Sequence, residues 1–399
     1  MSDQPHDRLP GGHQPHLLRR TGKALVVTVA LLVFLATAAG WATTRWVDGQ
    51  VRDVLALDPD SAAITNADAQ RGTENILLVG SDSRVGVQQE DNVGDTDLVG
   101  GARSDVVMVA HLPADRSHVV IVSFPRDLQI QRPRCTVWDP VSGAYTGETD
   151  AGAPVAKLNT AYQVGGPLCV TKVVQSLSGL AITRFVGVDF HGFKSMVDAV
   201  GGVRICVERP LKDSRLGTII SRQGFSTISG DTALNYVRAR HITGDPTSDY
   251  GRIARQQHFL SALLRQVLSP GVLLNPTKLR ALITAVAANT VGENVDSSAL
   301  LTLAQSVKGL RPTNVTFVTV PTTGSANKHG NEELRAPDTA ALFRSIIAGA
   351  DVTSAFVDEV AGDLSGSAGG PPAATTAPAV DPLVTAPLAT VNGADTACS

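Results

Sequence analysis

A long uncharged segment near the N-terminus divides the chain into two unequal parts. Residues 24–44, ALVVTVALLVFLATAAGWATT, carry no charged side chain between Lys23 and Arg45. As a helix rising about 1.5 Å per residue, this segment would cross the roughly 30 Å hydrocarbon core of a bilayer. Lys23 and the arginines before it predict that residues 1–23 remain in the cytoplasm. The chain is therefore predicted to be a single-pass protein of the cell membrane, with everything after Arg45 folding outside.

A second interpretation of the same segment stays open. Ala36, Thr37 and Ala38 have the small-x-small form of a signal-peptide cleavage site. The apolar run continues past this point, which favours an uncleaved anchor. Under either interpretation the bulk of the chain lies outside the cytoplasm.

The remainder of the chain divides into three regions by composition. Residues 45–71 are polar and are interpreted as a stalk. In residues 72–350, short β-branched runs alternate with segments of helical periodicity, which is typical of an α/β domain. Residues 351–399 are rich in Pro, Ala and Thr, contain no Lys or Arg, and are predicted to be disordered. The formal net charge of −3 argues against general binding to nucleic acid.

Within the domain, β-branched runs indicate strands and amphipathic spacing indicates helices. The predicted strands are 75–80, 106–112, 119–124, 184–188, 203–207 and 315–320. The predicted helices are 172–180, 191–200, 249–268, 277–288, 297–310 and 339–348. Residues 231–241 are predicted to pass from a short helix into a strand. Strands that alternate with helices indicate an α/β layered fold in one domain.

The four cysteines all follow the predicted anchor: Cys135, Cys169, Cys206 and Cys398. In an oxidising compartment a disulfide is expected before a metal site. Cys398 lies in the predicted disordered tail and is a poor structural partner, which favours Cys135–Cys169 or Cys169–Cys206. Cys135–Cys169 is the pairing we predict.

Charged side chains stand where the first three predicted strands begin or end. Asp82 and Arg84 follow the first strand, Arg103 and Asp105 lead into the second, and Arg126 follows the third. Strand ends in α/β sheets open onto the ligand crevice, so these groups are expected to converge. Singly, each is as readily explained by solvation of a turn.

A second group of charged side chains lies downstream. On a strand, Arg238 and Arg240 would share one face, where a diphosphate between them would relieve their repulsion. The alternative is that each arginine pairs with a structural carboxylate. Arg252, Arg255 and Gln256 have the spacing of one helix face near a helix N-terminus, which also favours anions.

Seven stretches, in order from Asn75 to Leu260, resemble the LytR–CpsA–Psr family of cell-wall glycopolymer ligases. They are NILLVGSDSR, RSDVVMVAHL, VIVSFPRDL, KLNTAYQVGGP, FVGVDFHGFKSMVDAVGGVRI, ALNYVRARH and DYGRIARQQHFL, within a motif core of residues 75–268. The resemblance implies a mixed sheet with an apolar groove for a polyprenyl chain. It also implies Mg²⁺-assisted transfer of a phosphoglycosyl polymer from a polyprenyl-pyrophosphate carrier to peptidoglycan.

Residue roles follow from the resemblance by motif position. Asp82 and Asp105 are implied to hold Mg²⁺, which binds through one or two carboxylates together with phosphate and water. The catalytic set implied is Asp82, Asp105, Arg126, Arg238 and Arg240. The pyrophosphate-binding set implied is Arg84, Arg103, Lys157, Arg252, Arg255 and Gln256. The acidic loop 86–101 departs from the family pattern by lengthening the segment between Asp82 and Asp105.

Two other functions use the same residues. A polyprenyl-pyrophosphate hydrolase would replace the acceptor hydroxyl by water, and a non-catalytic carrier-binding protein of the envelope would tolerate loss of the aspartates. A transcriptional regulator is disfavoured, because the sequence shows no helix-turn-helix signal or basic patch and the domain is predicted to lie outside the cytoplasm.

Overall fold

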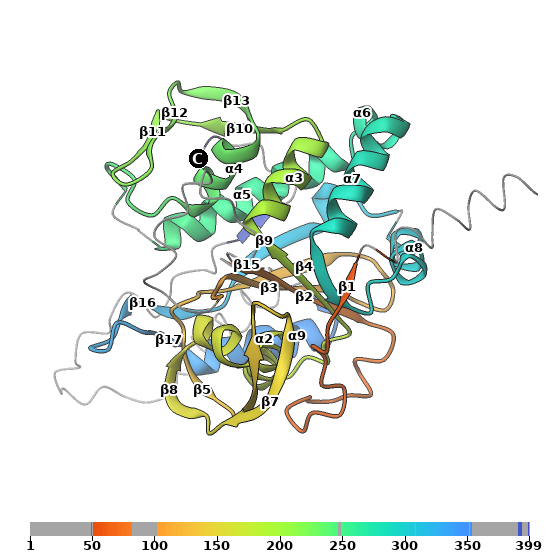
Figure 1. Ribbon diagram of the computed structural model, residues 1–399, viewed down its shortest axis with the longest axis vertical. Coiled ribbons are helices and arrows are strands. Elements are labelled where there is room, and N and C mark those ends of the chain that lie inside the picture. Colours follow the sequence, from red (N-terminus) through yellow and green to blue (C-terminus); the bar gives the residue numbers. More distant parts are fainter. Residues whose placement is uncertain are drawn as a thin grey trace, which may run out of the picture. The chain divides into compact units, whose positions relative to one another are not determined.

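Figure 1 shows the computed structural model, which describes residues 51–81, 102–245, 249–307 and 309–350, with positions 49, 352, 390–392 and 398. The chain separates into two compact units, Met1–Gly49 and Gln50–Ser399, and every element below belongs to the second. The predicted anchor, the loop 86–101 and most of the predicted disordered tail lie outside the described residues. Within the described ranges, no helix is long and apolar enough to span a bilayer.

An eight-stranded mixed sheet forms the centre of the described part of the fold, in the order β1-β14-β9-β2-β3-β4-β15-β18. β2 runs antiparallel to β3 and parallel to β9, while β4 runs parallel to β15. Its strands are β1 (Arg52–Asp53), β14 (Thr290–Glu293), β9 (Arg184–Asp189), β2 (Glu74–Ser81), β3 (Ser104–Leu112), β4 (Val119–Phe124), β15 (Val315–Thr319) and β18 (Thr390–Asn392). Five of the six predicted strands lie in this sheet, which confirms the predicted mixed α/β layering.

Helices cover both faces of the sheet (Figure 1). One face carries α2 (Leu158–Ser178) and α9 (Ala336–Ile347). The other carries α3 (Phe190–Ala199), α4 (Gly230–Arg238), α5 (Asp249–Val267) and α7 (Pro276–Ala288). Val107 and Val109 of β3 belong to the core that α2 helps to form, whereas Val106 and Met108 line the opposite face, as strand alternation requires.

Smaller elements complete the domain. Two short hairpins and a strand pair extend from the α2 side: β6 (Cys135–Asp139) with β7 (Ala144–Asp150), β16 (Thr322–Ala326) with β17 (Glu332–Leu334), and β5 (Gln129–Arg132) with β8 (Ala153–Lys157). Beside α4 and α5 lie β10 (Val203–Val207) with β13 (Gly224–Ile228), and β11 (Leu211–Asp213) with β12 (Gly217–Ile220). The remaining helices are α6 (Pro270–Leu273), α8 (Ser297–Ser306) and η2 (Pro312–Asn314).

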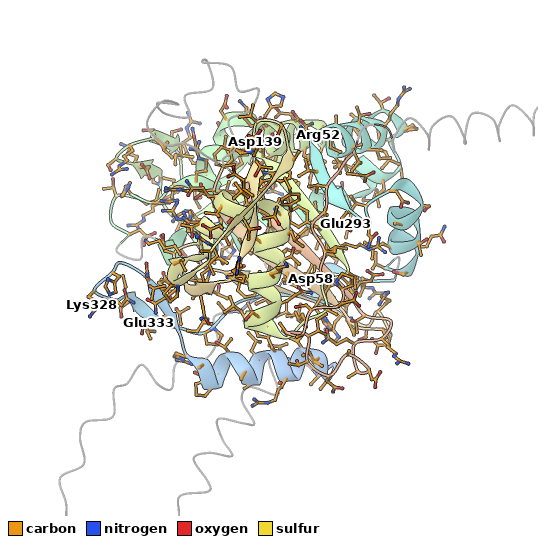
Figure 2. The ribbon with its side chains drawn as sticks, turned by 60° about the horizontal axis from the view of Figure 1, so that its bottom comes forward. Arg52, Asp58, Asp139, Glu293, Lys328 and Glu333 are labelled. Atoms are coloured by element: carbon orange, nitrogen blue, oxygen red, sulfur yellow. A yellow bond between two sulfur atoms is a disulfide. The ribbon has the colours of Figure 1, made fainter. Side chains whose placement is uncertain are left out.

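Residues 51–71, predicted as a stalk, instead pack on the domain. β1 adds a parallel strand to β14, and Ala56 is completely buried. The Glu293 carboxylate accepts the backbone N–H groups of Ala56 and Leu57 at 2.6 and 2.7 Å. Figure 2 labels Arg52, Asp58 and Glu293 along this edge of the fold. Val54, Ala56 and Leu57 lie in the core or pack against it. The polar composition of the segment as a whole did not reveal this, because the pairing of β1 uses backbone groups and only these few side chains make apolar contacts with the core.

The predicted disulfide between Cys135 and Cys169 is present, with a Cα–Cα distance of 5.6 Å. It joins β6 to α2, where the helix is interrupted at Gly165 and Gly166. A Cβ on Gly165 would come within 2.6 Å of the Cβ atoms of both cysteines, so only glycine permits this close approach. The bridge therefore depends on the helix interruption next to it.

The second bridge corrects a prediction. Cys398, judged a poor partner from the sequence, is bonded to Cys206 of β10, with a Cα–Cα distance of 4.5 Å. Tail residues Thr390–Asn392 form β18 on the edge of β15. Composition predicted a disordered tail, but an open sheet edge accepts backbone pairing from almost any sequence. The C-terminal cysteine therefore lies on the domain.

Candidate active site

A cavity of about 350 Å³ lies between the sheet and the helices α3, α4 and α5. Its apolar lining residues are Val106, Met108, Val188, Phe190, Phe193, Leu216, Leu234, Val237, Phe259 and Leu260. Its charged and polar lining residues are Asp105, Asp189, Asp213, Arg215, Arg238, Arg240, His241, Arg252 and Gln256. This composition suits an elongated apolar ligand with an anionic head group.

Asp105, at the start of β3, lies among three guanidinium groups. Its Oδ1 accepts from Arg126 Nη1 at 2.7 Å and from Arg240 Nη2 at 3.3 Å, and Arg252 acts on it electrostatically. Burial alone would raise the pKa of Asp105, but Arg126 and then Arg240 and Arg252 outweigh it and hold the pKa below its ordinary value. The carboxylate is thus ionised and is shared by Arg126 and Arg240 at the cavity.

The ion-pair network continues away from the cavity. Arg126 Nε lies 3.3 Å from Asp127 Oδ2, and Lys157 Nζ lies 2.9 Å from Asp127 Oδ1. Lys157 ends β8, which pairs with β5 directly after Asp127. The structure therefore connects the predicted Lys157 to the Asp105 cluster through two charged side chains, outside the cavity lining.

Arg238 and Arg240 both line the cavity, but the predicted strand that would carry them is wrong. Arg238 is the last residue of α4, and its guanidinium carbon lies 4.3 Å from the Phe190 ring centroid, a cation–π distance. Ala239 leaves the helical conformation with ψ of 133°, and Arg240 then turns toward Asp105. A helix end followed by an extended turn, rather than strand alternation, presents the two arginines to the cavity.

A buried carboxylate holds this turn in place. Asp213 Oδ2 accepts the backbone N–H groups of Arg240 at 3.0 Å and His241 at 2.8 Å. Asp213 Oδ1 accepts those of Arg215 at 2.8 Å and Leu216 at 3.0 Å. Burial acts to raise the pKa of Asp213, but these four hydrogen bonds lower it below its ordinary value. The segment after α4 also pairs with β11, because the Thr243 N–H donates to the Lys212 carbonyl at 2.9 Å. Asp213 therefore takes the two N–H groups that come just before this pairing.

The predicted group on α5 separates into two roles. Arg252 and Gln256 line the cavity, and Gln256 also donates to the Val237 carbonyl at 3.1 Å. Arg255 is buried and turns the other way, donating to the Ala239 carbonyl at 2.6 Å and to Asp245 Oδ2 at 3.0 Å. Its contacts fix the segment after α4, so the structure places it behind the site rather than among the ligand-facing groups.

The remaining predicted residues lie at or beyond the edge of the described structure. Arg103 Nε donates to Gln163 Oε1 of α2 at 3.0 Å. Asp82 and Arg84 lie outside the described residues. Ser81, immediately before Asp82, pairs with Asp189 of β9 and Ser104 of β3. The described part of β2 therefore ends between the start of β3, which carries Asp105, and the end of β9, which carries Asp189.

The carboxylates present can be compared with what Mg²⁺ requires. Among residues the structure describes, no three His, Cys, Asp or Glu side chains gather as a metal cage. Mg²⁺ does not need one, since it commonly binds through one or two carboxylates and completes its shell with phosphate and water. Ionised Asp105, on the cavity wall next to the end of β2, has the donor chemistry for such a site.

Three charged residues of the cavity lining were missed from the sequence: Asp189, Asp213 and Arg215. Asp189 ends β9 and caps α3 by accepting the Gly192 N–H at 2.8 Å, so the strand-end rule applied to Asp105 would have found it. Asp commonly accepts hydrogen bonds from the backbone of the turn that follows it, so the bonds of Asp213 to Arg215 and Leu216 could be expected from the local sequence. No local signal marks its contacts with Arg240 and His241, or the place of Arg215.

Known proteins match this chain in sequence and in fold. The model of the LytR_cpsA_psr family matches residues 49–343. The cell wall biosynthesis protein LcpA of Corynebacterium glutamicum is 32% identical over 75% of the chain, which spans 60% of LcpA. A polyisoprenyl-teichoic acid–peptidoglycan teichoic acid transferase, TagU of Enterococcus faecalis, is 27% identical over 67% of the chain and 77% of its own length.

The fold is also similar to that of solved structures. The LytR-Csp2A-Psr enzyme from Actinomyces oris superposes with a TM-score of 0.52 at 22% identity, covering 76% of this chain and 96% of that one. At this identity the similarity concerns the fold, and it agrees with the mixed sheet and flanking helices described above.

Proposed function

The chain belongs to the LytR_cpsA_psr family, and we propose that it transfers a phosphoglycosyl polymer from a polyprenyl-pyrophosphate carrier to peptidoglycan. We place this reaction at the outer face of the cell membrane, where the predicted anchor would hold the enzyme. The observation that carries the proposal is one cavity that joins an apolar wall to a rim of arginines around an ionised aspartate. The transferase name of TagU supports the same reaction class.

In this proposal the apolar part and the charged part of the cavity bind different parts of the carrier. The prenyl chain packs on Phe193, Phe259 and the other apolar lining residues, while the diphosphate lies at Arg238, Arg240 and Arg252. Guanidinium groups grip phosphate oxygens through paired N–H donors, and a partly dry site strengthens that attraction. The arginines thereby bind the carrier and stabilise the charge that develops on the oxygens during transfer.

The reaction is an exchange at one phosphorus atom. The acceptor hydroxyl oxygen bonds to the phosphorus that carries the glycan, the bridging P–O bond of the diphosphate breaks, and polyprenyl monophosphate leaves. The hydroxyl proton leaves with it or passes to solvent. Because the surrounding arginines lower its pKa, Asp105 is a weak proton acceptor, and we assign it an electrostatic role.

Mg²⁺ is the proposed cofactor. Asp105, together with Asp82, would hold it, and the donor chemistry of Asp105 fits the ion. When bound, the ion would neutralise negative charge on the diphosphate oxygens. Arg240, which contacts Asp105, would also neutralise negative charge on the diphosphate, so the ion and the guanidinium would act on the same group.

Product analysis tests the proposal. The purified full chain is incubated with a polyprenyl-pyrophosphate glycan and peptidoglycan, and the products are separated. Glycan joined to peptidoglycan through a phosphodiester, with release of polyprenyl monophosphate, is the expected result. Free glycan phosphate without attachment would identify a hydrolase, and binding without turnover would identify a carrier-binding protein. Either of these outcomes would contradict the transferase.

A further inference from the structure

Exposed leucines gather where α5 gives way to α6 and α7. Leu268, Leu273 and Leu274 all face solvent within a short segment, and Leu274 is 80% exposed. We call residues 268–276 the α6 corner. In Figure 1, α6 lies at the opposite side of the sheet from β5, β7 and β8. Adjacent large apolar side chains on a surface are usual where a protein contacts a partner or a membrane.

The charge around the α6 corner indicates the kind of partner. No Asp or Glu occurs between Asp249 and Glu293, whereas Arg265, Lys278 and Arg280 flank the corner. Asp198 of α3 lies near Pro276 and Arg280, so the acid-free stretch is a property of residues 250–292 and not of every neighbour. An apolar tip whose own segment carries only basic charges complements a bilayer surface of anionic lipid, where basic side chains meet head groups and leucines enter the boundary below them.

The helix α5 connects this corner to the cavity. Arg252 lies at its charged end beside Asp105, Phe259 and Leu260 line the apolar wall, and Leu268 follows the last turn. From Arg252 to Leu268 the helix rise carries the chain about 24 Å. One helix thus leads from the anionic head-group position, along the apolar wall, to the exposed corner.

We propose that the α6 corner docks on the outer surface of an anionic bilayer and that α5 guides the prenyl chain between that surface and the cavity. This inference rests on the proposed function for its ligand. It assigns to Leu273, Leu274 and the basic flanks a membrane-contacting role that is separate from binding in the cavity.

Fluorescence quenching tests the contact directly. The full chain, reconstituted in vesicles of phosphatidylcholine and phosphatidylglycerol, carries Leu274→Trp, and a matched protein carries Val141→Trp. Val141 is 75% exposed in the β6–β7 turn. Brominated lipids should quench the tryptophan emission added at position 274, and the quenching should be stronger when phosphatidylglycerol is present. The tryptophan emission added at position 141 should not be quenched. Equal quenching at the two positions would overturn docking by the α6 corner.

A paired activity measurement tests the guiding role. Leu273→Ser with Leu274→Ser should lower turnover of a glycan-bearing carrier embedded in vesicles several-fold and leave turnover of a short soluble prenyl-pyrophosphate glycan unchanged. The matched control is Val141→Ser with Val155→Ser, two exposed valines elsewhere. If the serine variant turns over both substrates at the wild-type rate, or loses turnover of both to the same extent, the guiding role is refuted. Wild type inactive on both would reject the proposed function, while quenching would still decide the docking.

Discussion

The Asp105 carboxylate is held ionised by arginines from three elements. Arg126 follows β4, Arg240 follows α4 and Arg252 lies on α5, so no single segment of sequence contains the cluster. Among the described residues that line the cavity, four arginines meet three aspartates, so the lining carries a small net positive charge. Guanidinium groups that are held in place before a ligand arrives are how preorganised charge contributes to catalysis.

Replacing the Asp105 carboxylate should remove the anionic partner that Arg126 and Arg240 share. Asp105→Asn keeps the side-chain shape, and we expect activity to fall ~10²–10³-fold. We also expect a loss of ~1–3 kcal/mol of stability, below the cost of breaking a fully buried pair because Asp105 is partly exposed. Added inorganic pyrophosphate should restore the melting temperature of the variant more than it raises that of wild type.

The control and the pH dependence distinguish this account from general damage. Asp150→Asn breaks a similar ion pair with Arg132 outside the cavity, and should gain no sensitivity to pyrophosphate. Since folding lowers the pKa of Asp105, its contribution to stability is complete above the unfolded value near ~4 and is lost as pH falls through the lower folded value. A stability difference that grows toward low pH would contradict the assignment.

At this scale the sequence predicted part of the group of charged residues that the cavity brings together, and only in part how they meet. Asp105 and Arg126 follow from the rule that strand ends converge. Arg255 was grouped with Arg252 by helix spacing, yet three residues along a helix turn a side chain far enough to face a different neighbour. Spacing gives a shared side of a helix, and packing decides which partner each side chain reaches.

Among the elements, the turn after α4 determines where Arg240 lies. Four backbone N–H groups converge on Asp213, two from its own hairpin turn and two from the turn after α4. The predicted strand failed here because alternation in YVRARH is equally compatible with a helix end and an extended turn. A contact across 28 residues of sequence, from Asp213 to His241, decided between them.

Asp213→Asn should therefore weaken ligand binding as well as the fold. The amide keeps one acceptor oxygen but directs N–H groups at two backbone donors, which costs about 1–3 kcal/mol for each unpaired group. We expect a lower melting temperature and a smaller rise on adding a soluble prenyl pyrophosphate. The comparison is Asp296→Asn, an N-cap of α8 that accepts from the Ala299 N–H. If both variants keep the full ligand-induced rise, Asp213 is structural alone.

At the scale of the molecule, the described residues form two hydrophobic cores that flank the eight-stranded sheet. The first joins the sheet to α2 and α9, and the second lies among α3, α4, α5 and the strands beside them. The cavity lies where the second core meets the sheet face. Alternating strands and helices predicted this layering. Composition could not predict that tail residues would extend the sheet or that Cys398 would reach Cys206, because both depend on contacts far apart in sequence.

The central claim is that one cavity binds the prenyl chain and the diphosphate together. The most direct measurement is the melting temperature of the full chain in nanodiscs with a soluble prenyl pyrophosphate, with inorganic pyrophosphate, or with the prenyl alcohol. A ligand at about 100 times its Kd stabilises a protein by ~2.7 kcal/mol. The account predicts that the prenyl pyrophosphate gives the largest rise and that Arg240→Lys, which keeps the charge but loses the paired donors, removes most of it. A rise matched by pyrophosphate alone, or retained in full by Arg240→Lys, would contradict it.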